Sequence, residues 1–143
     1  MERRNFIRLS VMGAGALGAA QHVLAQPTAV ESLATLKNIY FTQQSPGRWK
    51  GKEATHLPVI TVTTEGAKCH VNVVTPHEMK GLEHYIVKHV LLDKNYELLA
   101  EHIFNPLEDK IAASVFLINN YQGTLYALSM CNKHDLWLSS VNS

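Results

Sequence analysis

The sequence has few cysteines, no long apolar run and almost no excess of charge of either sign, and each shortage excludes a class of protein. Two cysteines cannot form the disulfide framework of a small secreted scaffold, so a packed core must supply most of the stability. Thirteen basic and 12 acidic side chains give a net charge of +1, which argues against a nucleic acid as partner. What is abundant is histidine, with eight in 143 residues, and imidazole is the commonest metal ligand in proteins.

Residues 1–25 have the order of an export signal: a basic start, a short apolar stretch and the small-residue cleavage site Val23-Leu24-Ala25. The apolar stretch has roughly 12 residues, too few for the ~20 that a membrane span needs. The adjacent Arg3 and Arg4 resemble the twin-arginine (Tat) signal of bacteria, which the Tat export machinery reads. We therefore expect removal of this segment and a periplasmic mature protein; an uncleaved anchor is the alternative.

The rest of the chain divides into a leader at 26–46 and a domain at 47–143. The leader holds a short helix or a loose tether around 27–37. In the domain, short β-rich runs alternate with turn-forming residues, and no long amphipathic helix is present to cover a parallel sheet. This spacing predicts an all-β fold, an antiparallel β-sandwich, with strands near 59–63, 70–74, 85–92, 111–118 and 124–129.

Four histidines and one cysteine lie at the edges of these predicted strands, where a sandwich gathers its loops. Cys131 and His134 are three residues apart at a strand end, His56 precedes a strand, and His77 and His84 bracket a loop between two strands. Five such donors leave a sixth octahedral position open, which suits a redox-active iron that binds a small molecule. Structural zinc prefers four ligands.

Three motifs in this order resemble the superoxide reductase family, that is, neelaredoxin and the iron domain of desulfoferrodoxin. They are His-x-Pro-Val-Ile from His56, Pro-His-x-Met followed by His-Tyr-Ile around His77 and His84, and Cys-Asn-x-His-x-Leu-Trp from Cys131. The last motif is the most specific of the three. The resemblance extends from Gly47 to Trp137, nearly all of the mature chain.

The resemblance implies an immunoglobulin-like sandwich holding one iron ion, with four equatorial imidazoles and one axial thiolate as its ligands. It also implies reduction of superoxide to hydrogen peroxide with one electron from an outside donor. No cysteine pairs precede the first ligand, so the rubredoxin-like domain of desulfoferrodoxin is absent and a separate protein, rubredoxin-like or a cytochrome, must supply the electron. The resemblance does not decide whether the protein forms a homo-oligomer. The implied ligands are His56, His77, His84, His134 and Cys131.

The chain departs from the family pattern before its first ligand. The family usually has Glu-Lys there, the lysine attracting superoxide and the glutamate closing the sixth position of ferric iron, whereas this chain has Ala54 and Thr55. Lys52 and Glu53, slightly earlier in a predicted mobile loop, are the candidates to replace that pair, with Lys50 as a further cation.

Two smaller departures concern turns. The loop between His77 and His84 is one residue longer than usual, and Gly81 can absorb the insertion. Asp135 stands where the family commonly has glycine, and aspartate tolerates a left-handed backbone better than most residues. Both turns are therefore expected to survive.

Two other functions compete with the reductase. A cupredoxin-like electron carrier also has Cys-x-x-His late in a sandwich, but it expects a methionine soon after the last histidine, and none follows Met130. A non-catalytic sensor would keep the iron site and lack turnover. The missing Glu-Lys pair favours this alternative. Apart from the ligands, Cys69 is expected in the core, and Trp49 and Trp137 are expected as core or loop-covering aromatics. Glu97 and Glu101 are expected on a solvated helix or loop face, and His70, His89 and His102 are expected to have no ligand role.

Overall fold

The computed structural model describes residues 38–143. The predicted twin-arginine signal segment and the short helix or tether expected around 27–37 lie outside these residues, and the boundary at Gly47 stays a prediction. Within 38–143, two antiparallel sheets form a sandwich, which confirms the predicted fold class. No helix in this described part is long and apolar enough to cross a membrane.

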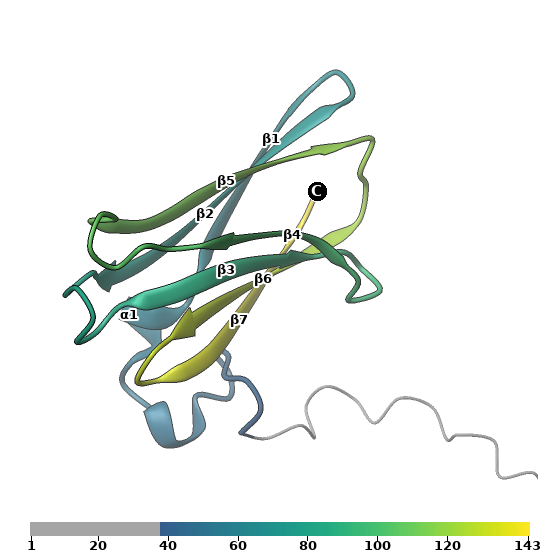
Figure 1. Ribbon diagram of the computed structural model, residues 1–143. Coiled ribbons are helices and arrows are strands. Elements are labelled where there is room, and N and C mark those ends of the chain that lie inside the picture. Colours follow the sequence, from purple (N-terminus) through teal and green to yellow (C-terminus); the bar gives the residue numbers. More distant parts are fainter. Residues whose placement is uncertain (1–37) are drawn as a thin grey trace, which may run out of the picture. The chain divides into compact units, whose positions relative to one another are not determined.

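One sheet has the strand order β1-β2-β5 and the other has the order β4-β3-β6-β7 (Figure 1). Neighbouring strands in both sheets are antiparallel, so the chain runs back and forth between the two ends of the sandwich. The strands are β1 (Val59–Glu65), β2 (Lys68–Glu78), β3 (Ile86–Leu92), β4 (Leu98–Ile103), β5 (Ile111–Asn119), β6 (Thr124–Cys131) and β7 (Asp135–Asn142).

Sequence patterns identified five of these strands and missed β4 and β7, which are both edge strands. We expected Glu97 and Glu101 on a solvated helix or loop face, but Glu101 lies in β4, where its carboxylate accepts a hydrogen bond from Lys88 of β3. β4 exposes most of its side chains, so it lacks the alternation that marks a half-buried strand.

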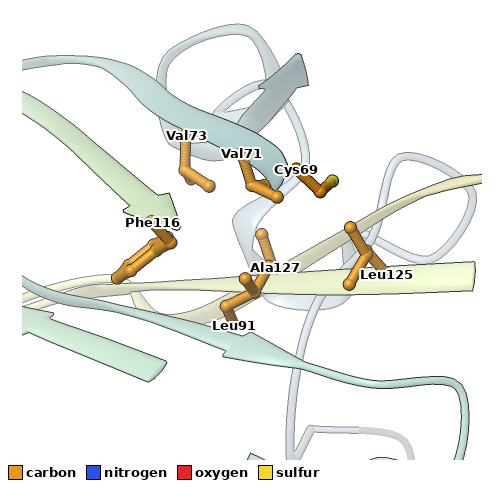
Figure 2. Packing of buried hydrophobic residues seen from close by; sticks show 7 residues of the cluster. All are labelled: Cys69, Val71, Val73, Leu91, Phe116, Leu125 and Ala127. Atoms are coloured by element: carbon orange, nitrogen blue, oxygen red, sulfur yellow. The ribbon is translucent and has the colours of Figure 1, made fainter. Parts of the chain in front are cut away.

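The apolar core lies between the two layers. Figure 2 shows side chains from both sheets directed toward one another, and this cluster consists of Cys69, Val71, Val73, Leu91, Phe116, Leu125 and Ala127. The alternating burial of β2, β5 and β6 produces it, because every second side chain of a strand faces the same side. Cys69 is a buried core residue, as the sequence predicted.

A polar network crosses the core beside this cluster. The fully buried His89 of β3 has its Nε2 atom 2.9 Å from Thr75 Oγ1 and its Nδ1 atom 2.8 Å from Ser114 Oγ, and Thr75 donates to Ser129 Oγ at 2.7 Å. These residues come from four strands in both sheets. Burial lowers the pKa of His89 to about 4, so the imidazole is neutral at physiological pH.

The depressed pKa of His89 predicts a pH-dependent stability. The unfolded chain binds the proton near pH 6.5 and the folded chain only near pH 4, so stability is full above pH 6.5 and falls as the pH decreases through this window. The full loss is about 3 kcal/mol. We expect urea unfolding of the metal-free protein to show a steeper pH dependence than that of His89→Gln, which lacks the titrating group. Equal pH dependences would contradict the prediction.

The segment before β1 packs across the end of the four-stranded sheet. Phe41 forms a parallel bridge with Trp137 of β7, and its buried ring lies 5.7 Å from the indole. A 3-10 turn, η2 (Gly47–Trp49), and one helical turn, α1 (Glu53–His56), follow. Lys52 is the N-cap residue of α1. The predicted mobile loop around Lys52 and Glu53 is therefore a structured turn.

Candidate metal centre

Five nitrogen and sulfur donors meet at one end of the sandwich. They come from the last residue of α1, the end of β2, the loop before β3, the end of β6 and the turn between β6 and β7. One donor atom from each residue lies within 4.8 Å of every other, and the residues are His56, His77, His84, Cys131 and His134. These are all five of the ligands that the family resemblance implied.

The four imidazoles form a ring in the order His56, His134, His84, His77. The distance is 3.0 Å from His56 Nε2 to His134 Nδ1, 3.0 Å from His134 Nδ1 to His84 Nε2, and 3.0 Å from His84 Nε2 to His77 Nε2. The ring closes where the centroids of His77 and His56 approach to 4.6 Å. His134 thus presents Nδ1 to the centre, whereas the other three present Nε2.

This donor set fits a single metal ion. Nitrogen ligands about 2.1 Å from a shared ion and at right angles to each other lie roughly 3 Å apart, and the three neighbouring pairs have this spacing. Hydrogen bonds alone explain the ring poorly, because each neutral imidazole has one N–H, whereas His134 Nδ1 and His84 Nε2 each face two neighbouring nitrogens. A cation that accepts all the lone pairs resolves this conflict.

The sulfur of Cys131 lies beside the imidazole ring. Its distance is 3.3 Å to His84 Nε2, 3.5 Å to His134 Nδ1 and 3.8 Å to His77 Nε2. Burial raises the pKa of the Cys131 thiol, so a metal ion must displace its proton on binding. The Lys133 backbone N–H donates to the sulfur at 3.5 Å, whereas the neighbouring Asn132 N–H donates to the Tyr85 carbonyl.

The electrostatics of the site keep the histidines in the form that binds metal. Burial lowers the pKa of all four, that of His56 to about 4, and the neighbouring imidazoles contribute further. Neutral imidazoles have a free lone pair at physiological pH. His56, His77 and Cys131 are buried while His84 and His134 are only half-buried, so the centre is covered by the sandwich and more open beside the last two.

Surrounding hydrogen bonds orient the ligands, a role that metal sites commonly assign to the outer shell. The Nδ1 atom of His56 lies 3.1 Å from the Lys52 carbonyl, so a proton there leaves Nε2 free for the ion. Trp137 donates its indole N–H to the His134 carbonyl at 2.9 Å.

The Asn132 side chain joins the two loops that carry ligands. Its carbonyl oxygen accepts from the Tyr85 N–H at 3.0 Å, and its amide donates to the Glu83 carbonyl at 3.2 Å. Sequence reasoning gave this side chain no role, because nothing in the motif shows which loop it faces. It ties the loop of His84 to that of Cys131.

Lys52 and Glu53, the two candidates for the missing charged pair, behave differently. Burial is the main cause of the lowered pKa of His77, His84 and His134, and the ammonium charge of Lys52 is one of the smaller contributions. The Glu53 carboxylate accepts a hydrogen bond from the Gly51 N–H at 2.6 Å. Lys52 thus lies in the helical turn that ends at the ligand His56, and the Glu53 carboxylate contacts the backbone just before that turn. A part for either residue in the reaction stays a prediction.

Fold and site together define a class: a β-sandwich protein with one mononuclear metal centre made of four imidazoles and a thiolate. The family model for desulfoferrodoxin matches residues 48–140, which is well over half of the chain. The chain belongs to the desulfoferrodoxin family.

Individual relatives agree with this assignment. The chain is 33% identical to the superoxide reductase of Pyrococcus abyssi over 106 residues, covering 66% of this chain and 90% of the relative. A crystal structure of superoxide reductase in the oxidised state superimposes with a TM-score of 0.54 at 29% identity, covering 67% and 92% of the two chains. The superoxide reductase (neelaredoxin) of Ignicoccus hospitalis shares the fold, with a TM-score of 0.61 at 23% identity over 73% and 93% of the chains.

Proposed function

We propose that this protein is a superoxide reductase that uses a mononuclear iron ion held by His56, His77, His84, His134 and Cys131. One observation carries the proposal: the five donors that the family motifs single out lie within 4.8 Å of one another, although they come from five separate parts of the chain. The reaction consumes one superoxide, one electron and two protons and yields one hydrogen peroxide. A ferrous ion held by these five residues would supply the electron, and an external donor protein would restore it.

The residues explain why an anion would react at this centre. Four neutral imidazoles and one thiolate leave a divalent cation with a net charge of +1, and Lys52 and Lys133 add positive charge near the half-buried His84 and His134. Superoxide is thereby attracted to the more open side of the site. The thiolate of Cys131 would donate electron density to a bound ion, and the Lys133 N–H, which donates to the sulfur, would moderate that donation.

The donor set argues against the cupredoxin alternative. A blue-copper centre uses two histidines and one cysteine with a weak axial ligand, whereas five strong donors converge here. The same count argues against structural zinc, which takes four ligands. The sensor alternative uses the same site and differs only in turnover.

Metal analysis of the aerobically purified mature protein, combined with its visible spectrum and with superoxide-consumption kinetics, tests the proposal. We expect one iron per chain and a thiolate-to-ferric band that ascorbate bleaches and superoxide restores. The same band without catalytic consumption of superoxide would identify a sensor. One copper per chain, or no metal, would overturn the five-ligand assignment.

The positions of Lys52 and Glu53 predict unequal effects of removing their charges. Lys52→Met should lower the second-order rate constant for superoxide about tenfold at low salt, because a cation beside the site raises the local concentration of an anionic substrate. The loss should shrink at high ionic strength. Glu53→Gln, in the neighbouring position, should change the rate less than twofold, because its carboxylate faces Gly51. Pulse radiolysis at two salt concentrations measures both, and equal effects of the two substitutions would contradict the prediction.

We also propose that residues 1–25 direct Tat-dependent export to the periplasm, supported by Arg3 and Arg4, the short apolar stretch and the cleavage site before Gln26. The full chain, expressed in a bacterium with this export machinery, should yield a periplasmic protein that begins at Gln26. The double substitution Arg3→Lys and Arg4→Lys should leave an uncleaved protein in the cytoplasm. Unchanged export of the double variant would overturn the Tat assignment.

A further inference from the structure

A single carboxylate connects the metal-binding turn to the chain segment that precedes α1. Oδ2 of Asp135 accepts the indole N–H of Trp49 at 2.8 Å and also accepts a hydrogen bond from the guanidinium of Arg48. Asp135 directly follows the ligand His134, whereas Arg48 and Trp49 lie more than 80 residues earlier, in η2. The contact therefore joins two distant parts of the chain at the site.

The backbone of Asp135 indicates that its side chain has a specific use. Its φ of 62° is in the left-handed region, which glycine enters freely and most other residues avoid. An aspartate there is somewhat strained unless its carboxylate makes contacts that compensate. The two donors in η2 provide these contacts.

The partners of Asp135 pack around the site on their own account. The Trp49 ring lies edge-on to the His134 imidazole, with 4.8 Å between centroids. The Arg48 guanidinium lies over the rings of Phe41 and Trp49, at 5.8 and 5.2 Å from their centroids. η2 thus packs against aromatic side chains beside the metal centre, and hydrogen bonds to Asp135 hold it in this position.

A continuous path of contacts leads from Asp135 back to another ligand. Trp49 uses its carbonyl to accept the Lys52 N–H at 2.9 Å, and the Lys52 carbonyl lies 3.1 Å from Nδ1 of His56. His56 and His134 are adjacent in the imidazole ring, 3.0 Å apart. These contacts therefore connect His134, in the turn between β6 and β7, with His56, in α1.

We propose that Asp135 is a positioning residue: through Arg48 and Trp49 it holds the segment before α1 against the metal-binding turn. We call the contacts of Asp135 with these two residues the Asp135 latch. The latch sets the spacing of His56 and His134 and keeps Lys52 at the site, and it rests on the proposed function only in assuming the five-ligand centre. It predicts that loss of the carboxylate speeds release of the metal.

The test measures how fast excess EDTA removes cobalt(II) from the reconstituted full-length protein, followed by loss of its visible absorption. Asp135→Gly removes the carboxylate and keeps a residue that adopts positive φ without strain, and we expect about tenfold faster release. Asp135→Asn, which still accepts from Trp49 but lacks the charge for Arg48, should be intermediate. The double variant Arg48→Met with Asp135→Gly should release no faster than Asp135→Gly alone, because both changes open the same latch.

Glu101→Gln is the matched control, because it breaks the ion pair with Lys88 on a strand that carries no ligand. Its release rate should equal that of the wild type. Urea unfolding of the metal-free proteins adds a readout that separates positioning from general stability: Asp135→Asn and Glu101→Gln should show equal midpoints while their release rates differ. We also expect the cobalt thiolate band to shift in Asp135→Gly and not in the control.

Two outcomes would overturn the latch without affecting the proposed function. Release from Asp135→Gly at the wild-type rate would show that the carboxylate does not position the ligands, and additive effects of Arg48→Met and Asp135→Gly would show that they act separately. A wild-type protein that fails to take up one cobalt per chain would overturn the proposed function, and the latch with it. Wild-type uptake with unchanged release from the glycine variant would overturn the latch alone.

Discussion

Replacing Cys131 by serine is expected to abolish the visible thiolate band and to lower the rate constant for superoxide at least ~100-fold. Substituting a residue that only hydrogen-bonds to a metal ligand typically lowers metal affinity or activity about 10–100-fold, and Cys131 is itself a ligand. A hydroxyl oxygen is a weaker donor than a thiolate, so the electron density that favours reduction at the open position is lost. Four imidazoles remain, and iron should still bind, with lower affinity. The spectrum, the iron content and pulse radiolysis of the purified variant measure these three consequences.

Cys69→Ser is the matched control, since the chain has only these two cysteines and Cys69 lies in the apolar core. It buries a hydroxyl in place of a thiol and should cost about 1–2 kcal/mol of stability while leaving the band unchanged. A visible band that survives Cys131→Ser, or one that disappears with Cys69→Ser, would show that the sulfur ligand has been assigned to the wrong residue.

The second large effect is expected at Trp137, where the core and the metal centre share one side chain. Its indole is fully buried, packs against Phe41 and lies 5.6 Å from the His56 ring between centroids. Trp137→Ala should lower the free energy of unfolding of the metal-free protein by about 3–5 kcal/mol, because it leaves a large cavity. It should also speed metal release, because the His134 carbonyl loses its hydrogen bond and His56 loses its packing.

Urea unfolding and cobalt release measure the two effects of Trp137→Ala. Leu117→Ala provides the control, since this side chain is 55% exposed on β5 and its loss should change stability by less than about 1 kcal/mol. A Trp137→Ala protein as stable as the wild type would contradict the packing described here. Trp137→Phe keeps most of the packing but removes the N–H, so it separates the loss of volume from the loss of the hydrogen bond.

The departure from the family's Glu-Lys pair has a physical resolution in α1. Lys52 is the N-cap residue and His56 ends the same helical turn, four residues later. Residues at this separation lie on one face of a helix, so we expect a lysine four positions before the ligand to face the same side as His56. The sequence presents Lys52 only as part of a loop of unknown direction, whereas the structure makes it the N-cap residue of the helical turn that carries His56.

The sequence by itself determined the ligand set and the class of fold. Histidines and a cysteine at the edges of predicted strands marked the candidate donors, and the resemblance of their motifs to the superoxide reductase family implied that they bind one ion. Alternating apolar residues in β2, β5 and β6 define faces that must be buried. The buried Cys69 was also predicted from its place in a β-rich run, and Trp137, expected as a core or loop-covering aromatic, lies in the core. The order of the motifs was enough to infer one shared metal ion before any distance was known.

Only the tertiary structure decided which side chains support that ion. The edge strands β4 and β7 form because neighbouring strands offer backbone partners, and β4 leaves no strong pattern of its own. The His89 network and the Asp135 latch join residues far apart in the chain, and a single polar residue does not reveal its partner. Contacts of this kind depend on how two sheets and the segment before β1 pack together, so they cannot be predicted from the local sequence around either partner.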